Sequence, residues 1–317
     1  MAAVQLGQYA PAEKILVHLS DTHFLADRAA LYGAVDTDRT VHRAFEQLHR
    51  SGIRPDALIL TGDVADRGEP DAYRRIRGIV EAAAAQWDAT IIWVMGNHDR
   101  RESFRSVLLG AAHPRDPNRA EGEPPVDQAP VDQAPVDQVH DLDGLRIIAL
   151  DTSVPGYHHG EVTDEQLSWL TEVLAQPARH GSILALHHPP IPTPLPLMSV
   201  LELHDQPRLA AVLAGSDVRA ILGGHLHYST QGLFAGIPVS VAAATCYTMD
   251  LSAPERALTG VNGGQTLNLV HVYADQITHS QMPIGEFTAV TQFSTAVVDR
   301  LATLSAEERR QVFSRQQ

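Results

Sequence analysis

Seven side chains of the types that bind metal ions occur in five short motifs, each after an apolar run. They are Asp21 and His23 in Asp-Thr-His, Asp63 in Gly-Asp, Asn97 in Gly-Asn-His-Asp, His187 in His-His-Pro, and His225 and His227 in Gly-His-Leu-His. Carboxylate and amide oxygens with imidazole nitrogens, and no thiolate, suit first-row transition ions. Seven ligands are too many for one ion but suit two ions that share a carboxylate. Two ions about 3.5–4 Å apart can stabilise the attacking and leaving oxygens of phosphoryl transfer, so the motifs predict that chemistry.

Each motif also has a plain structural interpretation. A lone Asp-x-His is commonly a turn, a lone His-Pro a strand end and a lone Gly-Asp a loop. All five together, in this order and each after a predicted strand, favour the metal site. Asp63 is the natural bridging ligand, because it is a carboxylate between the other two motifs of the first half of the chain. Asn97 is a neutral ligand that adds no negative charge.

The elements that position these motifs alternate between strands and helices. Apolar runs predict strands over residues 15–19, 58–60, 91–95, 183–186 and 218–222. Capping residues and prolines predict helices that begin near Asp36, at Pro70 and after the Thr163-x-x-Gln166 capping box. Further strands are expected as a hairpin over 139–142 and 145–150 and as antiparallel strands over 237–243 and 267–273. The prediction is one α/β sandwich with the ligands beyond the carboxyl ends of its strands.

Charge and composition exclude several classes of protein. Lys+Arg 24 against Asp+Glu 38 gives a net charge of −14, which repels polyanions, so no nucleic-acid partner is predicted. Cys246 is the only cysteine, so an intrachain disulfide is impossible. The first residues lack a signal-peptide pattern, and no apolar run approaches the ~18 residues of a transmembrane helix. A cytoplasmic protein is expected.

Two segments depart from the α/β pattern. Residues 113–139 contain a proline-rich acidic repeat of five residues and predict an extended or disordered insert, with a docking tract as the alternative. After a catalytic domain over residues 1–285, the tail 286–317 has apolar residues at spacings of three and four. They predict a helix and are Val290, Phe293, Val297, Leu301 and Leu304. This helix is expected on the sandwich or at a dimer contact; a peripheral membrane anchor is the alternative, which its mixed charges weaken.

The combined motifs resemble those of the calcineurin-like metallophosphoesterases, in family order, over about residues 14 to 285. The resemblance implies a sandwich of two mixed β-sheets flanked by helices and two bound metal ions, Fe with Mn, Mn with Mn, or Zn. It implies that one ion is held by Asp21, His23, Asp63 and His227. It implies that the other is held by Asp63, Asn97, His187 and His225. It also suggests a homodimer.

Longer stretches resemble the class III cyclic-nucleotide phosphodiesterases of the mycobacterial type. They include Leu-Tyr-Gly-Ala-Val-Asp at 31–36, Thr-Gly-Asp-Val-Ala-Asp-Arg-Gly-Glu-Pro at 61–70 and Gly-His-Leu-His-Tyr-Ser-Thr at 224–230. The resemblance implies hydrolysis of 3′,5′-cyclic nucleotides, cAMP and also cGMP, to nucleoside 5′-monophosphates. Two departures are the insert at 113–139 and Tyr157, where the family pattern has a third consecutive histidine; Tyr157 puts substrate contacts in question.

The expected mechanism is in-line attack on phosphorus by a hydroxide that bridges the two metals, whose pKa lies far below that of bulk water. His98, beside Asn97, is the predicted donor of a proton to the leaving alkoxide, and Asp99 is either its orienting partner or a structural residue. His18 and His188 are expected to pack or to support ligands. The residues expected to contact substrate are His23, Asp66, Asn97, His98, His158 and His227.

Two rival functions are compatible with the same motifs. One is a broad-specificity phosphodiesterase that acts on 2′,3′-cyclic nucleotides or other small phosphodiesters, because the same pair of metals serves many esters. The other is a catalytically silent scaffold of the same fold, which retention of all seven ligand-type residues and His98 disfavours.

Overall fold

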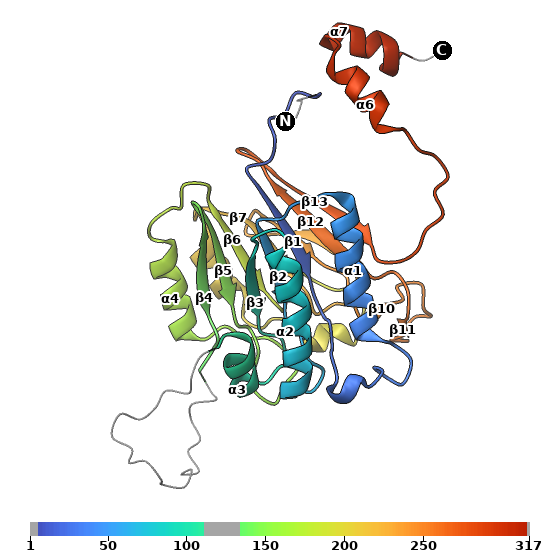
Figure 1. Cartoon of the computed structure of the whole chain (residues 1–317). Coiled ribbons are helices and arrows are strands. Elements are labelled where there is room, and N and C mark those ends of the chain that lie inside the picture. The colour runs from blue at the N-terminus through green and yellow to red at the C-terminus, as the bar shows by residue number, and fades with distance from the viewer. Residues whose placement is uncertain (1–5, 111–133, 316–317) are drawn as a thin grey trace.

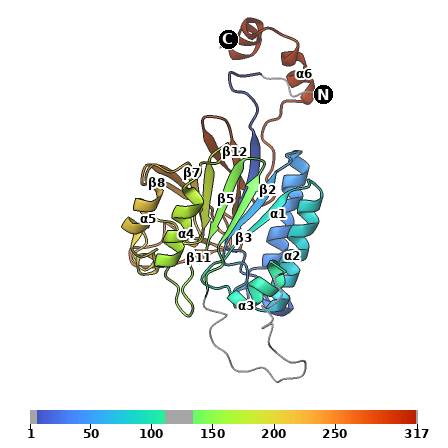
Figure 2. The same cartoon turned by 90° about the vertical axis from the view of Figure 1, so that its left-hand side faces the viewer.

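Two mixed β-sheets pack face to face, and helices cover both outer faces (Figures 1 and 2). The computed structural model describes residues 6–110 and 134–315. The five-stranded sheet has the order β13-β12-β1-β2-β3, with bounds Ile277–Pro283, Thr266–Val272, Lys14–Leu19, Ala57–Thr61 and Thr90–Val94. The six-stranded sheet has the order β4-β5-β6-β7-β9-β8, with bounds Gln138–Leu142, Leu145–Leu150, Ser182–Leu186, Val218–Gly223, Ile237–Val241 and Thr230–Phe234. The predicted sandwich is confirmed.

Short elements and helices connect the strands. A small separate sheet pairs β10 (Thr248–Met249) with β11 (Gly260–Val261). The longer helices are α1 (Thr37–Ser51), α2 (Pro70–Ala85), α4 (Asp164–Leu174), α5 (Gln206–Leu213) and α6 (Thr295–Ala302). The shorter ones are η1 (Ala26–Arg28), α3 (Arg101–Ser103), η2 (Phe104–Leu108), η3 (Met198–Leu201), α7 (Ala306–Arg309) and η4 (Arg310–Ser314). The capping box predicted for α4 is present, with both hydrogen bonds between Thr163 and Gln166.

The apolar core lies in three layers. Helices α1 and α2 cover the five-stranded sheet through side chains such as Leu48 and Tyr73. Helices α4 and α5 cover the six-stranded sheet through side chains such as Leu170 and Leu209. The two sheets meet through residues that include Ile59 and Ile147. Because both sheets are buried on both faces over these strands, their apolar runs are continuous, and this is why the sequence predicts them.

The two strands predicted near residues 240 and 270 lie in different sheets. Strand β9 is parallel to β7 and antiparallel to β8. Strand β12 is antiparallel to β1 and β13. The predicted antiparallel pairing is therefore found on both sides of β12. Strand β9 has an antiparallel neighbour on one side only, and on its other side it pairs in parallel with β7. The sequence does not reveal β8 and β13, because many of their residues are polar and none is buried.

The last residues of the predicted 113–139 insert belong to the packed body. Most of that segment lies outside the described residues. Val136 is only 5% exposed, and its N–H donates to the Asp151 carboxylate at 2.9 Å. The Asp137 carboxylate accepts hydrogen bonds from the N–H of Asp151 at 2.8 Å and from the Gln166 amide at 2.9 Å. Because these residues are packed and β4 begins at Gln138, the predicted C-terminal boundary of the insert, at residue 139, is wrong.

A pair of deletions tests this correction. Deletion of residues 113–133 is expected to leave the melting temperature nearly unchanged, because loop closure changes by only ~0.6 kcal/mol per doubling of length. Deletion of 113–138 also removes the buried Val136 side chain and the Asp137 hydrogen bonds, which should cost at least about 2 kcal/mol and several degrees. Thermal unfolding of the two proteins side by side measures the difference. Equal melting temperatures would contradict the packed role of residues 134–138.

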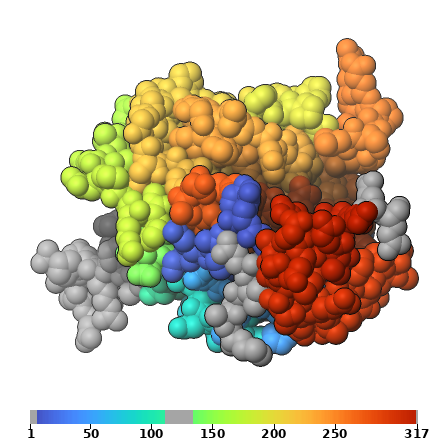
Figure 3. Space-filling model, turned by 90° about the horizontal axis from the view of Figure 1, so that it is seen from above, coloured from blue at the N-terminus to red at the C-terminus, as the bar shows by residue number. Residues whose placement is uncertain are grey.

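The tail after Gly285 folds on itself near Leu6, at the start of the described part of the chain (Figure 3). The helix predicted from Val290 begins only at Thr295, and no residue of α6 is buried. The Phe293 and Phe313 rings lie 5.7 Å apart, and Arg309 donates to the Leu6 carbonyl. The helix therefore does not lie on the sandwich, contrary to one of the two expectations for it, and a dimer contact stays a prediction. None of the helices in the described ranges combines the length and hydropathy needed to cross a membrane.

Candidate metal centre

The five ligand motifs meet at one rim of the sandwich, where the carboxyl ends of parallel strands from both sheets converge. Asp21, Asp63 and Asn97 follow β1, β2 and β3, whereas His187 and His225 follow β6 and β7. Backbone hydrogen bonds join the loops, since the Asp21 N–H donates to Gly62 and the His23 N–H donates to Asp63. All of the predicted ligands except Asn97 are buried. The structure therefore brings together ligand-type residues more than 200 positions apart.

The ligand atoms lie at the spacing expected around shared ions. Asp63 Oδ2 is 3.4 Å from both His23 Nε2 and His187 Nε2. His227 Nε2 is 3.3 Å from Asp21 Oδ1, and His187 Nε2 is 3.0 Å from Asn97 Oδ1. Ligands at about 2.0–2.2 Å from one ion are about 3–3.5 Å from each other. The position of Asp63 between two histidines supports it as the shared ligand.

In each of the four predicted histidine ligands, one ring nitrogen is hydrogen-bonded to an oxygen that can act only as an acceptor. These acceptors are Asp66 for His23 Nδ1, Thr61 O for His187 Nδ1, Leu201 O for His225 Nε2 and Tyr247 O for His227 Nδ1. The bound nitrogen carries the hydrogen when the ring is neutral, so the other nitrogen presents a lone pair. Metal-binding histidines are oriented in this way.

The ring nitrogens of His23 and His187 that face Asp63 are suited to a bound cation. His23 Nε2 is buried and has no hydrogen-bond partner among the described residues. On His187, burial lowers the pKa, but Asp63 and Asp21 raise it to about 9. Burial alone would raise the pKa of the Asp63 carboxyl, but His187 and the neighbouring histidines hold this pKa well below its ordinary value. The raised pKa of His187 indicates that the two carboxylates favour positive charge at this position, which a bound metal ion would supply. The residues present therefore fit a metal-binding site.

The backbone at five of these residues adopts the left-handed conformation, with φ of 52° at Asp21, 45° at His23, 48° at Asp63, 69° at His225 and 55° at His227. This region is sparsely populated by residues other than glycine and costs on the order of 1–3 kcal/mol per residue. Such strain clusters at functional sites, where the surrounding structure enforces it. No spacing or composition in the sequence predicts it.

Neighbouring glycines allow this close approach. A Cβ on Gly96 would collide with the backbone and carboxylate of Asp63, and one on Gly224 would collide with the Ser20 hydroxyl. Larger residues at either position would therefore move a ligand loop.

His98 is a partly exposed residue beside the predicted ligands, and it contacts Asp63 through its backbone N–H. Its N–H donates to Asp63 Oδ1 at 2.8 Å, and its ring Nδ1 donates to the Asp66 carbonyl at 2.9 Å. The side chain is 29% exposed, and its ring lies 4.7 Å from that of His23. The Asp66 carboxylate is bound to His23, so Asp66 orients a predicted ligand as well as facing His98.

Asp99 has a structural role and does not orient His98. Its buried carboxylate accepts hydrogen bonds from the N–H groups of Val64, Ala65 and Gly96 and from the Tyr73 hydroxyl. Burial, with the nearby charge of Asp63, raises the pKa of the Asp99 carboxyl to about 6. Of the two roles considered from the sequence, the structural one fits these contacts.

The other histidines support the rim. The exposed His158 ring is 2.9 Å from the Asn97 amide, which places it beside a predicted ligand. His188 bonds to Thr152 and to the His158 carbonyl, so both of its ring nitrogens have partners. His18 Nε2 contacts the Thr61 hydroxyl at 2.8 Å. The supporting roles expected for His18 and His188 agree with these contacts, whereas Tyr157 is 61% exposed.

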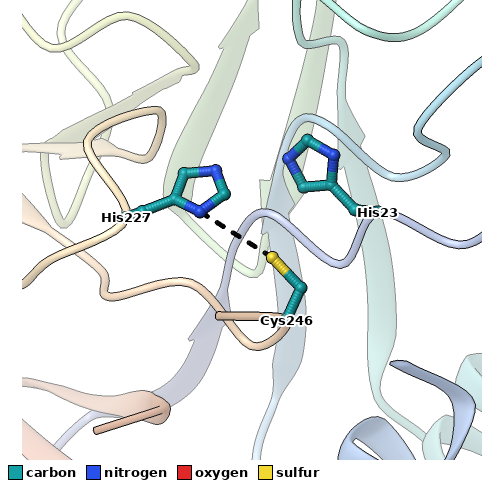
Figure 4. A group of neighbouring side chains, drawn as sticks. All are labelled: His23, His227 and Cys246. Carbon is teal, nitrogen blue, oxygen red and sulfur yellow. Dashed lines mark hydrogen bonds between the residues drawn. The ribbon is translucent and has the colours of Figure 1, made fainter. Parts of the chain in front are cut away.

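The sequence gives no sign of the loop after β9, which also forms part of the site. Cys246 comes from this loop, and its sulfur lies 3.8 Å from His227 Nδ1 (Figure 4). The adjacent Tyr247 carbonyl fixes the same nitrogen, and the Tyr247 ring lies 4.4 Å from that of His227. Burial raises the pKa of the Cys246 thiol. A single cysteine without a metal-binding spacing carries no sequence signal for this position.

Comparison with known proteins agrees with this geometry. Residues 15–229 match the model of the calcineurin-like phosphoesterase family. The chain is 51% identical to a cAMP/cGMP dual specificity phosphodiesterase of Mycobacterium tuberculosis, over 92% of this chain and 86% of that protein. It is 52% identical to a probable cyclic nucleotide phosphodiesterase of Rhodococcus erythropolis, over 91% and 89% of the two chains. A dimetal phosphatase of Danio rerio superposes with a TM-score of 0.57 at 15% identity, over 87% of this chain and 98% of that chain, which indicates a common fold.

Proposed function

Because this chain belongs to the calcineurin-like phosphoesterase family, we propose that it is a two-metal phosphodiesterase that hydrolyses 3′,5′-cyclic nucleotides, cAMP and cGMP, to nucleoside 5′-monophosphates. The similarity to cyclic-nucleotide phosphodiesterases over more than nine tenths of the chain supports the substrate class. The observation that carries the proposal is the meeting of all seven predicted ligands at one rim, with the buried ring nitrogens of His23 and His187 directed at Asp63 Oδ2.

Two sets of residues would hold the ions, with Asp63 in both. One set is Asp21, His23, Asp63 and His227, and the other is Asp63, Asn97, His187 and His225. When bound, the ions supply Lewis acidity at the phosphoryl oxygens and an activated water at neutral pH. Oxygen and imidazole ligands without a thiolate suit Fe with Mn, Mn with Mn, or Zn. Thr61, Asp66, Leu201 and Tyr247 fix the histidine tautomers, so the ligand lone pairs are already oriented.

His98 is the proposed general acid. Because its Nδ1–H donates to a backbone carbonyl, Nε2 is the nitrogen left to exchange a proton with substrate. The Asp66 carboxylate also lies 3.7 Å from His98 Nδ1, so it helps to hold the ring in this orientation. Hydrolysis to a 5′-monophosphate breaks the bond between phosphorus and O3′, and Nε2–H would donate its proton to the departing O3′ alkoxide. His158, joined to Asn97 at the exposed side of the rim, is placed to contact the phosphate or ribose.

A substrate panel tests the proposal. The purified protein loaded with manganese is expected to hydrolyse 3′,5′-cAMP and 3′,5′-cGMP with higher kcat/KM than 2′,3′-cAMP, glycerophosphodiesters and bis-p-nitrophenyl phosphate. Product analysis by chromatography should give the 5′-monophosphate. A higher kcat/KM for 2′,3′-cyclic nucleotides or glycerophosphodiesters would instead favour the broad-specificity phosphodiesterase. Absence of turnover on every ester by protein that holds two ions would support a scaffold.

The tail is proposed to act in association of a homodimer rather than in catalysis. A chain that ends at Gly285 is expected to keep its metal content and its kcat within about twofold, because no residue of α6 is buried and the ligands all precede the cut. Light scattering should show a change in oligomeric state or solubility. Loss of turnover in a folded, metal-loaded chain of this length would place part of the active site in the tail.

A further inference from the structure

Two histidines and a glutamate outside the catalytic rim form a second group of metal-ligand type. His159 Nε2 lies 3.1 Å from Glu161 Oε1, and His204 Nδ1 lies 3.7 Å from the same oxygen. The two imidazole rings are stacked, with centroids 4.3 Å apart and an interplanar angle of 15°, so one ring must rotate for both nitrogens to face one ion. Four ligands at about 2.0–2.1 Å from a tetrahedral ion lie about 3.3 Å from each other, and the two measured separations fall on either side of that value.

The backbone holds the three residues in this arrangement. Gly160 forms a β-bridge with Leu203, its N–H donates to the Glu202 carbonyl at 3.1 Å, and the His204 N–H donates to the Gly160 carbonyl at 2.8 Å. In an extended segment, residues on either side of Gly160 point to the same face, which places His159 and Glu161 together. In the sequence, the group lies just before α4 and α5, the two helices that cover the six-stranded sheet (Figure 2).

Both solvent access and local charge suit a cation here. The side chains of Glu161 and His204 are 53% and 50% exposed, whereas that of His159 is only 18% exposed. The nearby guanidinium of Arg208 is paired with the Asp164 carboxylate and so does not neutralise Glu161. Two imidazoles and one carboxylate with an open fourth position form a ligand set typical of zinc.

We propose that His159, Glu161 and His204 bind a third divalent metal ion, of the zinc type, separate from the two ions of the rim. The ion would join the loop before α4 to the loop before α5. The first loop also carries His158, which contacts Asn97, and a Cβ on Gly160 would collide with the His188 ring. The third ion would therefore hold in place the loop that carries His158. Binding of this ion can be measured independently of catalysis.

Zinc titration of the protein already loaded with two manganese ions tests the site. Equilibrium dialysis with elemental analysis should find three ions per chain, counting zinc and manganese together, because zinc can also replace manganese at the rim. His204→Ala and His159→Ala should each weaken this binding by more than the roughly 10–100-fold that loss of a supporting partner costs. His180→Ala is the matched control, because His180 pairs with Glu13 at 2.9 Å in a similar surface ion pair without a second histidine; it should keep the third ion.

Hydrogen exchange gives an independent measurement. At a zinc concentration of about 100 times Kd, opening of the bridge should be about 100-fold rarer, so the Gly160 and His204 amides should exchange correspondingly more slowly. The same amides should be unaffected by zinc in His204→Ala. The proposal is overturned if wild type takes up no third ion, or if the double variant His159→Ala/His204→Ala still binds it.

Discussion

Replacement of Asp63 by alanine is expected to empty both metal positions and to lower kcat/KM for cyclic AMP by more than about 10³-fold, which corresponds to roughly 4 kcal/mol of transition-state stabilisation. Asp63 Oδ2 is the one ligand atom that lies within 3.4 Å of histidines from both sets. Its loss also removes the carboxylate opposite His23 and His187. Elemental analysis of the purified variant measures the metal content directly.

Two further variants make this experiment specific. Asp63→Asn keeps an oxygen that can accept the His98 N–H, so it separates the loss of charge from the loss of that hydrogen bond. Asn97→Ala should lower the occupancy of only one position, because Asn97 Oδ1 contacts His187 and belongs to one proposed set. Full metal content and turnover in folded Asp63→Ala would refute the shared-ligand assignment.

The second large effect is expected for His98→Ala, which should keep both ions but lose about 10²–10⁴-fold in kcat on cyclic AMP. The metals should remain because His98 contacts Asp63 through its backbone N–H, which alanine retains. The loss on bis-p-nitrophenyl phosphate should be much smaller, because p-nitrophenolate leaves readily without a proton. Turnover and metal content are measured on both substrates.

His158→Ala is the matched control for this comparison. His158 lies 5.1 Å from the His98 ring and contacts Asn97, so it shares the surroundings but not the proposed proton transfer. Its loss should lower activity on both substrates by similar factors. If His98→Ala also impaired both substrates equally, His98 would be a positioning residue and the proton would have another source.

The sequence indicates where the candidate ligands lie because two independent signals coincide at each motif. A continuous apolar run shows a buried strand, and a residue with metal-binding chemistry follows it, as with Leu58–Leu60 before Asp63. Parallel strands then bring their carboxyl ends to one edge of the sheet. Neither signal specifies backbone dihedral angles, so the left-handed conformations of the ligands emerge only from the three-dimensional structure.

The repeat shows a different limit of prediction. Val126, Val131 and Val136 occupy the same place in a Pro-Val-Asp-Gln sequence. The local sequence therefore predicts the same extended structure for all three. The side chains that bury Val136 come from elsewhere in the chain, in the apolar cluster that includes Met95 and Phe104. Asp151 and Gln166 fix the backbone of Val136 and the side chain of Asp137 by hydrogen bonds. The tail is similar, because its apolar spacing predicts a helix but not that Val290 and Phe293 lie before its first residue.

The left-handed ligands have a consequence for how this protein can change over evolutionary time. Glycine adopts that backbone region without the steric penalty, so His23→Gly or His225→Gly would relieve backbone strain but would also remove a buried imidazole and its hydrogen bond to Asp66 or Leu201. The strained backbone therefore does not itself favour histidine at these positions; the ring nitrogen that the side chain presents does. A lineage released from the need to cleave esters would keep the sandwich, and the backbone would not oppose the replacement of these histidines by glycine.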